Sequence, residues 1–159
     1  MSEPVRVLIA DDHPMFRDGL AAVLRAGPGM ELAGAAATGA EAVMLARRVQ
    51  PDVVVMDLRM PGMSGIDAIR AIIADCPGVA VIALTMFDDD ESVLAALRAG
   101  ACGYLLKGED QGAIWRAVQA GAAGEAIFGA GWPSDCSAAW QGGNHKPTAE
   151  RPAGESPAY

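Results

Sequence analysis

Five short stretches rich in aliphatic residues recur along the first two thirds of the chain, and each has the length of a β-strand. They cover residues 5–10, 30–36, 52–56, 79–84 and 103–106. Three of them are nearly continuous aliphatic runs, without the alternating polar residues of a strand that has one face in water. Strands buried on both faces have this pattern, and such strands belong to parallel sheets covered by helices.

The segments between these stretches carry apolar residues three or four positions apart, which is the spacing of one face of a helix. Thr38 and Ser64 stand where helix N-caps are expected, and Gly27 and Gly100 stand where helices should end. Five such strand–helix units predict an α/β fold. We expect a doubly wound, five-stranded parallel sheet in the flavodoxin-like order 2-1-3-4-5, with helices on both faces. The apolar stripes are Phe16, Leu20, Val23 and Leu24; Ala42, Leu45, Ala46 and Val49; Ile66, Ile69 and Ile73; Val93, Leu94 and Leu97; and Ile114, Ala117 and Val118.

The pattern ends near residue 127, because Ile127 is the last Ile, Leu, Val or Met of the chain. The remaining residues are rich in Gly, Pro, Ala and Ser and have no apolar periodicity, so they cannot build a core. We therefore predict one domain over residues 1–128 and a disordered tail over residues 129–159. Trp132 and Trp140 could mark a peptide that docks on a partner, but incidental aromatic residues in a tail are the favoured interpretation.

Composition narrows the class of protein. The chain has 159 residues, of which 52% are hydrophobic and 20% charged, and this balance is typical of a globular domain. Its net charge of −8 argues against a surface built to neutralise nucleic-acid phosphates. No apolar run is long enough to span a bilayer, and the N-terminus lacks the apolar core of a signal peptide. Three cysteines without a CxxC pair indicate reduced thiols, so we expect a cytoplasmic protein without contact with membranes.

Polar residues gather where four of the predicted strands end. Asp11 and Asp12 follow the first strand, Asp57 the third, Thr85 the fourth and Lys107 the fifth. Ligands of open α/β sheets bind at the carboxyl ends of the strands, beside the point where the strand order reverses. The sequence therefore predicts that three acids, a hydroxyl and an ammonium converge at one edge of the sheet.

Three carboxylates in one place need relief from their mutual repulsion. Two unit charges about 4 Å apart repel by roughly 4 kcal/mol at an effective dielectric constant near 20. Raised pKa values or a bound cation must offset that repulsion. Mg²⁺ suits a set of carboxylates, whereas Zn²⁺ would favour His or Cys. An aspartate nucleophile, a metal, a lysine and a hydroxyl together are suited to phosphoryl transfer onto a carboxylate.

Each residue also has an ordinary structural interpretation. Asp12 alone could cap the helix that follows it, and His13 is expected to be an exposed residue at the start of that helix. Thr85 could be an ordinary strand-end residue, Lys107 a solvated surface charge and Asp57 the first residue of a turn. The functional interpretation is favoured because all of these residues would otherwise meet at one sheet edge by chance.

The same residues lie within motifs of a known family. The segments "LIADDHPMFRDGL", "DVVVMDLRMPGMSGIDAIR", "VIALTMFDDD" and "AGACGYLLKG" resemble the receiver domain of two-component response regulators. "DDHPMFRDGL" and "YLLKG" are similar to the NarL/FixJ-type subfamily. The resemblance runs from about Val5 to about Phe128, with every motif in order on the expected element.

This resemblance implies a phosphoacceptor and a magnesium site. Asp57 would accept a phosphoryl group from a sensor histidine kinase. Asp11 and Asp12 would hold Mg²⁺ together with Asp57 and the backbone carbonyl of Arg59. Such a protein is a phosphoprotein of signal transduction and not an enzyme, with at most slow self-dephosphorylation.

The resemblance also implies a conformational switch. Lys107 would pair with the phosphoryl group, Thr85 would be the switch hydroxyl, and Tyr104 stands at the switch aromatic position and would turn inward on phosphorylation. Pro61 and Gly65 would shape the loop after the acceptor. The switch would alter self-association as a phosphorylation-dependent homodimer, or pairing with a related regulator. Gly108 after the lysine replaces the Pro of many receivers.

The last thirty residues depart from the resemblance. Relatives of this type usually continue into a helix-turn-helix DNA-binding domain, but here the tail offers two basic residues, Lys146 and Arg151, and no recognition helix. We expect no DNA binding from this chain; the alternative is a DNA-binding regulator whose output domain is truncated or frame-shifted. An aspartate-nucleophile phosphatase is less favoured, because Arg59 stands where its second Asp would be. No G-x-G-x-x-G follows the first strand, which argues against a dinucleotide-binding protein.

Overall fold

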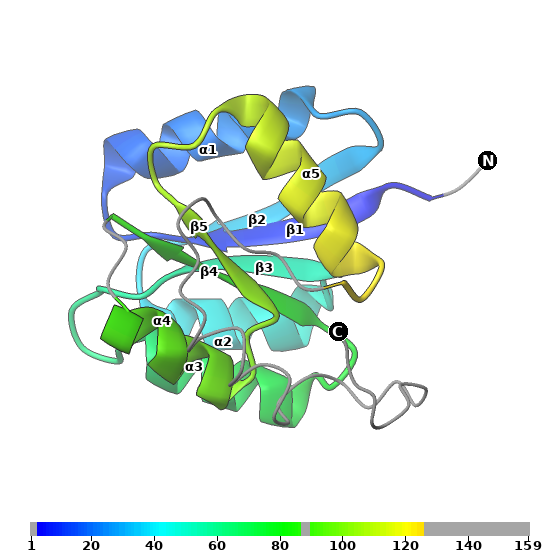
Figure 1. Ribbon diagram of the computed structural model, residues 1–159. Coiled ribbons are helices and arrows are strands. Elements are labelled where there is room, and N and C mark those ends of the chain that lie inside the picture. The colour runs from blue at the N-terminus through cyan, green and yellow to red at the C-terminus, as the bar shows by residue number, and fades with distance from the viewer. Residues whose placement is uncertain (1–2, 87–89, 126–159) are drawn as a thin grey trace, which may run out of the picture.

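The computed structural model describes residues 3–86 and 90–125. Their parallel sheet has the order β2-β1-β3-β4-β5, as predicted (Figure 1). The third and fourth strands each begin and end one residue later than expected, so Asp57 and Thr85 are the last residues of their strands. The strands are β1 (Val5–Ala10), β2 (Met30–Ala36), β3 (Val53–Asp57), β4 (Ala80–Thr85) and β5 (Gly103–Leu106), and the helices are α1 (Pro14–Ala26), α2 (Gly39–Val49), α3 (Gly65–Asp75), α4 (Asp90–Ala99) and α5 (Gln111–Ala122).

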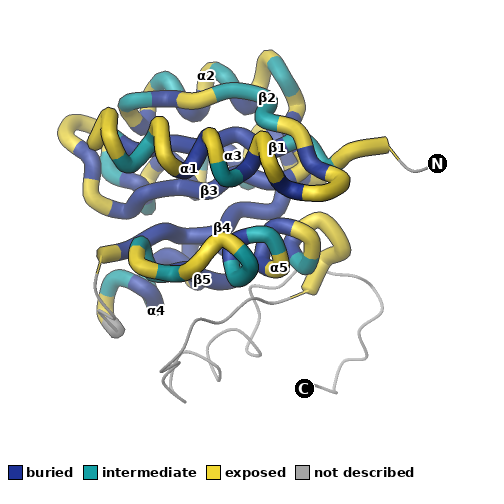
Figure 2. Tube along the Cα trace, turned by 90° about the horizontal axis from the view of Figure 1, so that it is seen from above, coloured by how far each residue is buried: buried dark blue, intermediate teal, exposed yellow. Residues whose placement is uncertain are grey.

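The helices cover both faces of the sheet: α1 and α5 lie on one side, and α2, α3 and α4 on the other (Figure 1). Successive residues of β1 point to opposite layers. Val7 and Ile9 pack into the core beneath α1 and α5, while Leu8 and Ala10 pack into the core beneath the other three helices. β3 and β4 are buried along their whole length, which explains their continuous aliphatic runs (Figure 2).

Helix boundaries follow the predicted capping residues. Thr38 accepts a hydrogen bond from the amide of Glu41, and Ser64 accepts one from the amide of Asp67, so both N-caps are confirmed. Gly27 is the C-cap of α1, but its backbone is extended and not left-handed. A side chain at Gly27 would place its Cβ 2.6 Å from Met30 Sδ and 2.8 Å from Trp115 Nε1. Close packing therefore accounts for this glycine.

The remaining expectations concern membrane-spanning helices, the cysteines and the C-terminal tail. Within the described residues no helix is both long and apolar enough to cross a membrane. Cys76 and Cys102 are not disulfide-bonded. Cys136, the predicted tail at 129–159 and the end of the predicted domain at residue 128 lie outside the described residues.

Candidate functional site

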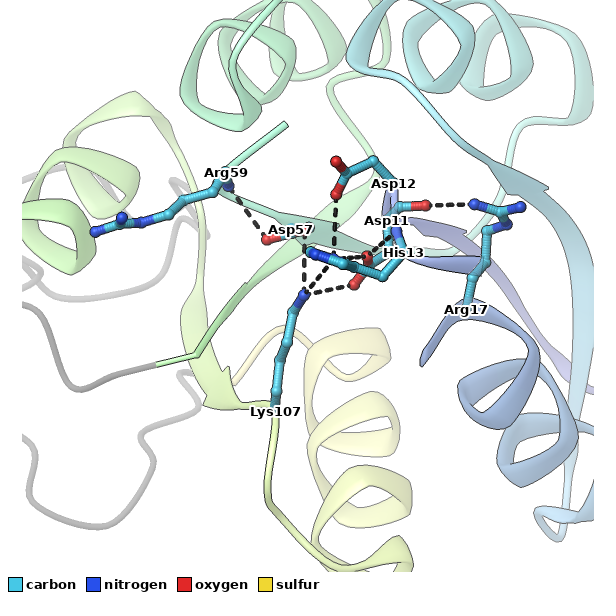
Figure 3. Close-up of polar contacts among 7 residues, drawn as sticks. All are labelled: Asp11, Asp12, His13, Arg17, Asp57, Arg59 and Lys107. Atoms are coloured by element: carbon cyan, nitrogen blue, oxygen red, sulfur yellow. Dashed lines mark hydrogen bonds and ion pairs between the residues drawn. The ribbon is translucent and has the colours of Figure 1, made fainter. Parts of the chain in front are cut away.

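The residues predicted at the strand ends converge in space, and Figure 3 shows the charged ones. Asp11 directly follows β1, Asp57 ends β3 and Lys107 directly follows β5. The parallel register sets these strand ends side by side, since Ala10 pairs with Met56 and Asp57 with Leu84. The carboxylates of Asp11 and Asp57 are almost fully buried, although both residues are charged types.

Lys107 joins the two buried acids. Its Nζ lies 2.9 Å from Oδ2 of Asp11 and 3.2 Å from Oδ2 of Asp57. The ammonium also lies 4.9 Å from the centre of the Phe16 ring, within range of a cation–π interaction. The Lys107 side chain is 7% exposed, so it is not the solvated surface charge of the alternative interpretation. Phe16 was predicted only as a core residue of α1, and its contact with the lysine had no signal in the sequence.

At both ends of this ion pair, burial and the oppositely charged partner shift the pKa in opposite directions. Burial raises the pKa of the Asp57 carboxyl and the nearby Asp11 charge adds to it, outweighing the Arg59 amide and Lys107, which lower it. Burial disfavours the charged form of Lys107, but the carboxylates of Asp11 and Asp57 together raise its pKa above the ordinary value. The site therefore holds a protonated lysine beside the Asp57 carboxylate, whose negative charge is only partly compensated.

His13 is an exposed residue at the start of α1, as expected, and its side chain also belongs to the cluster. It is the N-cap of α1, but its side chain makes no capping hydrogen bond. Its Nδ1 instead lies 3.1 Å from Oδ1 of Asp11 and 3.2 Å from Oδ1 of Asp12. Asp12 precedes the cap, so its alternative role as the cap of α1 is not observed. The only sequence signal for His13 was its position directly after the two acids.

The donor atoms of the cluster fit a divalent cation. Asp11, Asp12, His13 and Asp57 each offer one ligand atom, and these atoms lie within 4.8 Å of one another. Two buried carboxylate oxygens, Oδ2 of Asp11 and Oδ1 of Asp12, accept no well-aligned hydrogen bond. The first lies near Nζ of Lys107, and the second lies near Nδ1 of His13. Oxygen atoms left in this state are suited to a hard cation such as Mg²⁺. The predicted magnesium set of Asp11, Asp12 and Asp57 is thus brought together.

Arg59 meets Asp57 through its backbone. The Arg59 amide donates a hydrogen bond of 3.1 Å to Oδ1 of Asp57, while its side chain extends away from the cluster (Figure 3). This contact fixes the start of the loop after β3 against the Asp57 carboxylate. The role of the Arg59 carbonyl as a metal ligand stays a prediction.

Thr85 and Tyr104 lie on the neighbouring strands. Thr85 is 4% exposed, and its carbonyl accepts a hydrogen bond of 2.8 Å from the amide of Lys107. Tyr104 is completely buried in the core with α4 residues Val93, Ala96 and Leu97. We expected Tyr104 to turn inward on phosphorylation, but the ring is already inside in this structure.

The loop between β3 and α3 contains Pro61 and Gly65. Gly65 begins α3, and a side chain there would overlap the carbonyl oxygen of Asp57 and come within 2.6 Å of Leu58 Cα. The Gly65 amide donates to the carbonyl of Leu58 at 3.2 Å. Glycine is therefore required for the close approach of α3 to the backbone of Asp57 and Leu58. Pro61 is exposed in the loop, and its shaping role stays a prediction.

Comparison with known proteins gives one consistent family. Residues 7–119 match the response regulator receiver domain family. The nitrate/nitrite response regulator protein NarP of Escherichia coli (strain K12) is 42% identical over 125 residues, covering 79% of this chain and 58% of NarP. The transcriptional regulatory protein LiaR of Bacillus subtilis (strain 168) is 46% identical over 121 residues, covering 76% of this chain and 57% of LiaR. The match thus spans a little over half the length of these curated relatives.

Solved structures agree with the sequence comparisons. The signal receiver domain of NarL from Mycobacterium tuberculosis has a TM-score of 0.75 and 36% identity, covering 78% of this chain and 100% of that one. A LuxR-family two-component response regulator from Aurantimonas sp. SI85-9A1 has a TM-score of 0.75 and 33% identity, covering 87% of this chain and 96% of that one. The chain therefore belongs to the response regulator receiver family and carries a receiver domain of the NarL/FixJ type from a two-component system.

Proposed function

We propose that Asp57 is the phosphoacceptor of this receiver and that a sensor histidine kinase supplies the phosphoryl group. One observation carries the proposal: Asp57 is a buried carboxylate at the carboxyl edge of the sheet, 3.2 Å from the ammonium of Lys107 and within the acidic cluster. Burying a carboxylate costs free energy, and ionisable groups in such costly positions are concentrated at functional sites.

The transfer itself is a nucleophilic displacement at phosphorus. A carboxylate oxygen of Asp57 forms the new bond to phosphorus, while the bond between phosphorus and the donor atom breaks and the donor leaves with its electron pair. Lys107 stays protonated and neutralises the negative charge that gathers on the phosphoryl oxygens. The Arg59 amide keeps the acceptor carboxylate oriented. The proposed product is an aspartyl phosphate.

A divalent cation belongs to this site. Asp11, Asp12 and Asp57 would hold Mg²⁺, with the Arg59 carbonyl as a further ligand, and the buried unsatisfied oxygens of Asp11 and Asp12 support this assignment. The bound cation supplies positive charge that draws the phosphoryl oxygens toward the acceptor. Asp11 and Asp12 therefore act as metal ligands and not as general acids or bases.

The proposed output is a change in association. Thr85 would hydrogen-bond a phosphoryl group on Asp57, and the surface formed by α4, β5 and α5 would respond. Phosphorylation would then favour a homodimer or pairing with a related regulator. Slow self-dephosphorylation would return the receiver to its resting state.

Acetyl phosphate, Mg²⁺ and intact-mass measurement test the assignment. Wild-type protein should gain about 80 Da, the mass of one phosphoryl group, and Asp57→Asn should gain nothing. Asp67→Asn is the matched control, because Asp67 is an exposed acid on α3 that pairs only with Arg70 among the described contacts. An adduct that persists in Asp57→Asn would overturn the assignment.

A further inference from the structure

We propose that Nδ1 of His13 is a ligand of the divalent-cation site, so that this receiver binds a first-row transition-metal dication more tightly than Mg²⁺. The inference deepens the proposed function, because it rests on the cation site of Asp11, Asp12 and Asp57. It adds a nitrogen ligand that an all-oxygen magnesium site lacks.

The positions of the donor atoms carry the first part of the argument. Two ligands about 2.1 Å from one ion and at right angles to each other lie about 3 Å apart. Nδ1 of His13 lies 3.1 Å from Oδ1 of Asp11 and 3.2 Å from Oδ1 of Asp12. Both separations suit neighbouring ligands of one octahedral ion.

The second part of the argument is that one buried carboxylate oxygen accepts no hydrogen bond. Oδ1 of Asp12 is buried and accepts no hydrogen bond, although the imidazole nitrogen of His13 is 3.2 Å away. Nδ1 itself is within hydrogen-bond distance of Oδ1 of Asp11, at 3.1 Å, and of Nζ of Lys107, at 3.5 Å, so it already faces the other groups of the site. A cation held by Nδ1 and Oδ1 of Asp12 would satisfy the Asp12 oxygen, which the present contacts do not.

The backbone holds His13 in place for this role. The His13 amide donates a hydrogen bond of 2.8 Å to Oδ1 of Asp11, which ties the residue to the first acid of the site. Pro14 begins α1 directly afterwards and restricts the chain at this point. The ring is 61% exposed, so it can rotate by small amounts to meet an ion without disturbing the core.

Ligand chemistry then sets the selectivity. Mg²⁺ favours oxygen ligands, whereas imidazole suits Ni²⁺ and its first-row neighbours. Three carboxylates and one imidazole should therefore discriminate against Mg²⁺. His13 becomes the residue that sets the metal preference of the site.

Calorimetric titration of tag-free, full-length protein with Mg²⁺ and with Ni²⁺ tests the proposal. His13→Ala should lose at least about tenfold in Ni²⁺ affinity, in line with lost ligand interactions, and change Mg²⁺ affinity by less than about threefold. The chain has a second histidine, His145, and His145→Ala is the matched control that should retain wild-type affinities. Circular dichroism checks that each variant is folded.

Mn²⁺ gives an independent readout in the same protein. Pulsed electron paramagnetic resonance should detect ¹⁴N coupled to bound Mn²⁺ in wild type and lose that coupling in His13→Ala. If wild type binds these ions without nitrogen coupling and His13→Ala changes all affinities alike, His13 is only a partner of the carboxylates and the inference is wrong. If wild type binds neither Mg²⁺ nor Mn²⁺, the cation site of the proposed function fails as well.

Discussion

The carbonyl of Thr85 accepts a hydrogen bond of 2.8 Å from the amide of Lys107. Thr85 ends β4 and Lys107 follows β5, so this contact joins the two strand ends beside the acceptor. A displacement of Thr85 toward a phosphoryl group would therefore pull on the backbone that carries Lys107. The pair would give the proposed phosphorylation a direct physical link to the β5 side of the domain.

Thr85→Ala should accept a phosphoryl group but lose the conformational response. Removing the hydroxyl leaves Asp57, Lys107 and the backbone contact in place, so the adduct of about 80 Da should still form. The phosphorylation-dependent change in sedimentation or in NMR amide shifts of β5 should be lost. Thr85→Ser, which keeps the hydroxyl, should retain it; an unchanged response in Thr85→Ala would refute the switch role.

Lys107→Met should bind Mg²⁺ more tightly and support phosphoryl transfer less well. The ammonium lies within 3.2 Å of oxygens of both Asp11 and Asp57, so it repels a cation at the same carboxylates. Removing that charge should tighten Mg²⁺ binding by about three- to tenfold, the scale of one interaction between partly screened charges. Calorimetry measures the affinity and intact mass measures the adduct. A weaker affinity for Mg²⁺ would show that Lys107 supports the metal site instead of competing with it.

Asp57→Asn should stabilise the metal-free domain near neutral pH. The pKa of Asp57 is raised above its ordinary value of 3.8, chiefly by burial, so the folded state binds a proton more readily than the unfolded chain. Ionised Asp57 consequently lowers the free energy of unfolding, and this loss develops as the pH rises above 3.8. A neutral amide avoids the loss at every pH.

Thermal unfolding in EDTA measures this effect. At pH 7.5 the variant should melt above wild type. The difference should shrink as the pH falls, because Asp57 of the folded wild type takes up its proton. Mg²⁺ should stabilise wild type more than the variant, because the variant lacks one carboxylate ligand. A variant less stable than wild type at pH 7.5 would contradict the direction of the pKa shift.

The 159-residue chain should show no sequence-selective binding of duplex DNA. Specific readout needs an ordered element in a groove and several Lys or Arg contacts to phosphates. The net charge of the chain is −8, and beyond residue 128 its only Lys and Arg residues are Lys146 and Arg151. A mobility shift with specific and scrambled duplexes at two salt concentrations tests this expectation. A salt-dependent and sequence-selective shift would show that residues 129–159 contribute a DNA-binding element.

The strands and helices were predictable because their physical causes are local in the sequence, whereas the order of the strands followed from the fold class that they indicated. Continuous aliphatic runs such as 53–56 identify strands buried on both faces, and Thr38 and Ser64 mark helix starts through their own hydroxyls. The strand ends were also predictable, since a parallel sheet brings Asp11, Asp57 and Lys107 to one edge.

Contacts that depend on side-chain direction were not predictable in the same way. His13 has the ordinary position of a helix N-cap, and only the three-dimensional turn after β1 aims its Nδ1 at two carboxylates. Phe16 shares the apolar stripe of α1, and the stripe carries no information about the Lys107 ammonium above its ring. The inward position of Tyr104 is likewise a property of the packed core and has no signal in the strand pattern of residues 103–106.

Gly65→Ala should reduce both the stability of the domain and the reactivity of Asp57. A methyl group at this position would overlap the carbonyl oxygen of Asp57 and lie 2.6 Å from Leu58 Cα, and backbone atoms cannot move aside as a flexible side chain can. We expect a loss of about 2–3 kcal/mol in the free energy of unfolding, the usual cost of an overpacked contact. The displaced end of β3 should also slow phosphorylation by acetyl phosphate in the molecules that remain folded.

Gly19→Ala is the matched control, because Gly19 lies inside α1 and a Cβ there meets no atom within 4 Å. Alanine in a helix interior should raise the free energy of unfolding by about 0.5–1 kcal/mol and leave phosphorylation unchanged. Urea unfolding gives the two free energies, and a time course of intact mass gives the relative rates. If Gly65→Ala kept wild-type stability and rate, α3 could retreat from the acceptor without consequence, and the close approach at Gly65 would have no role in placing Asp57.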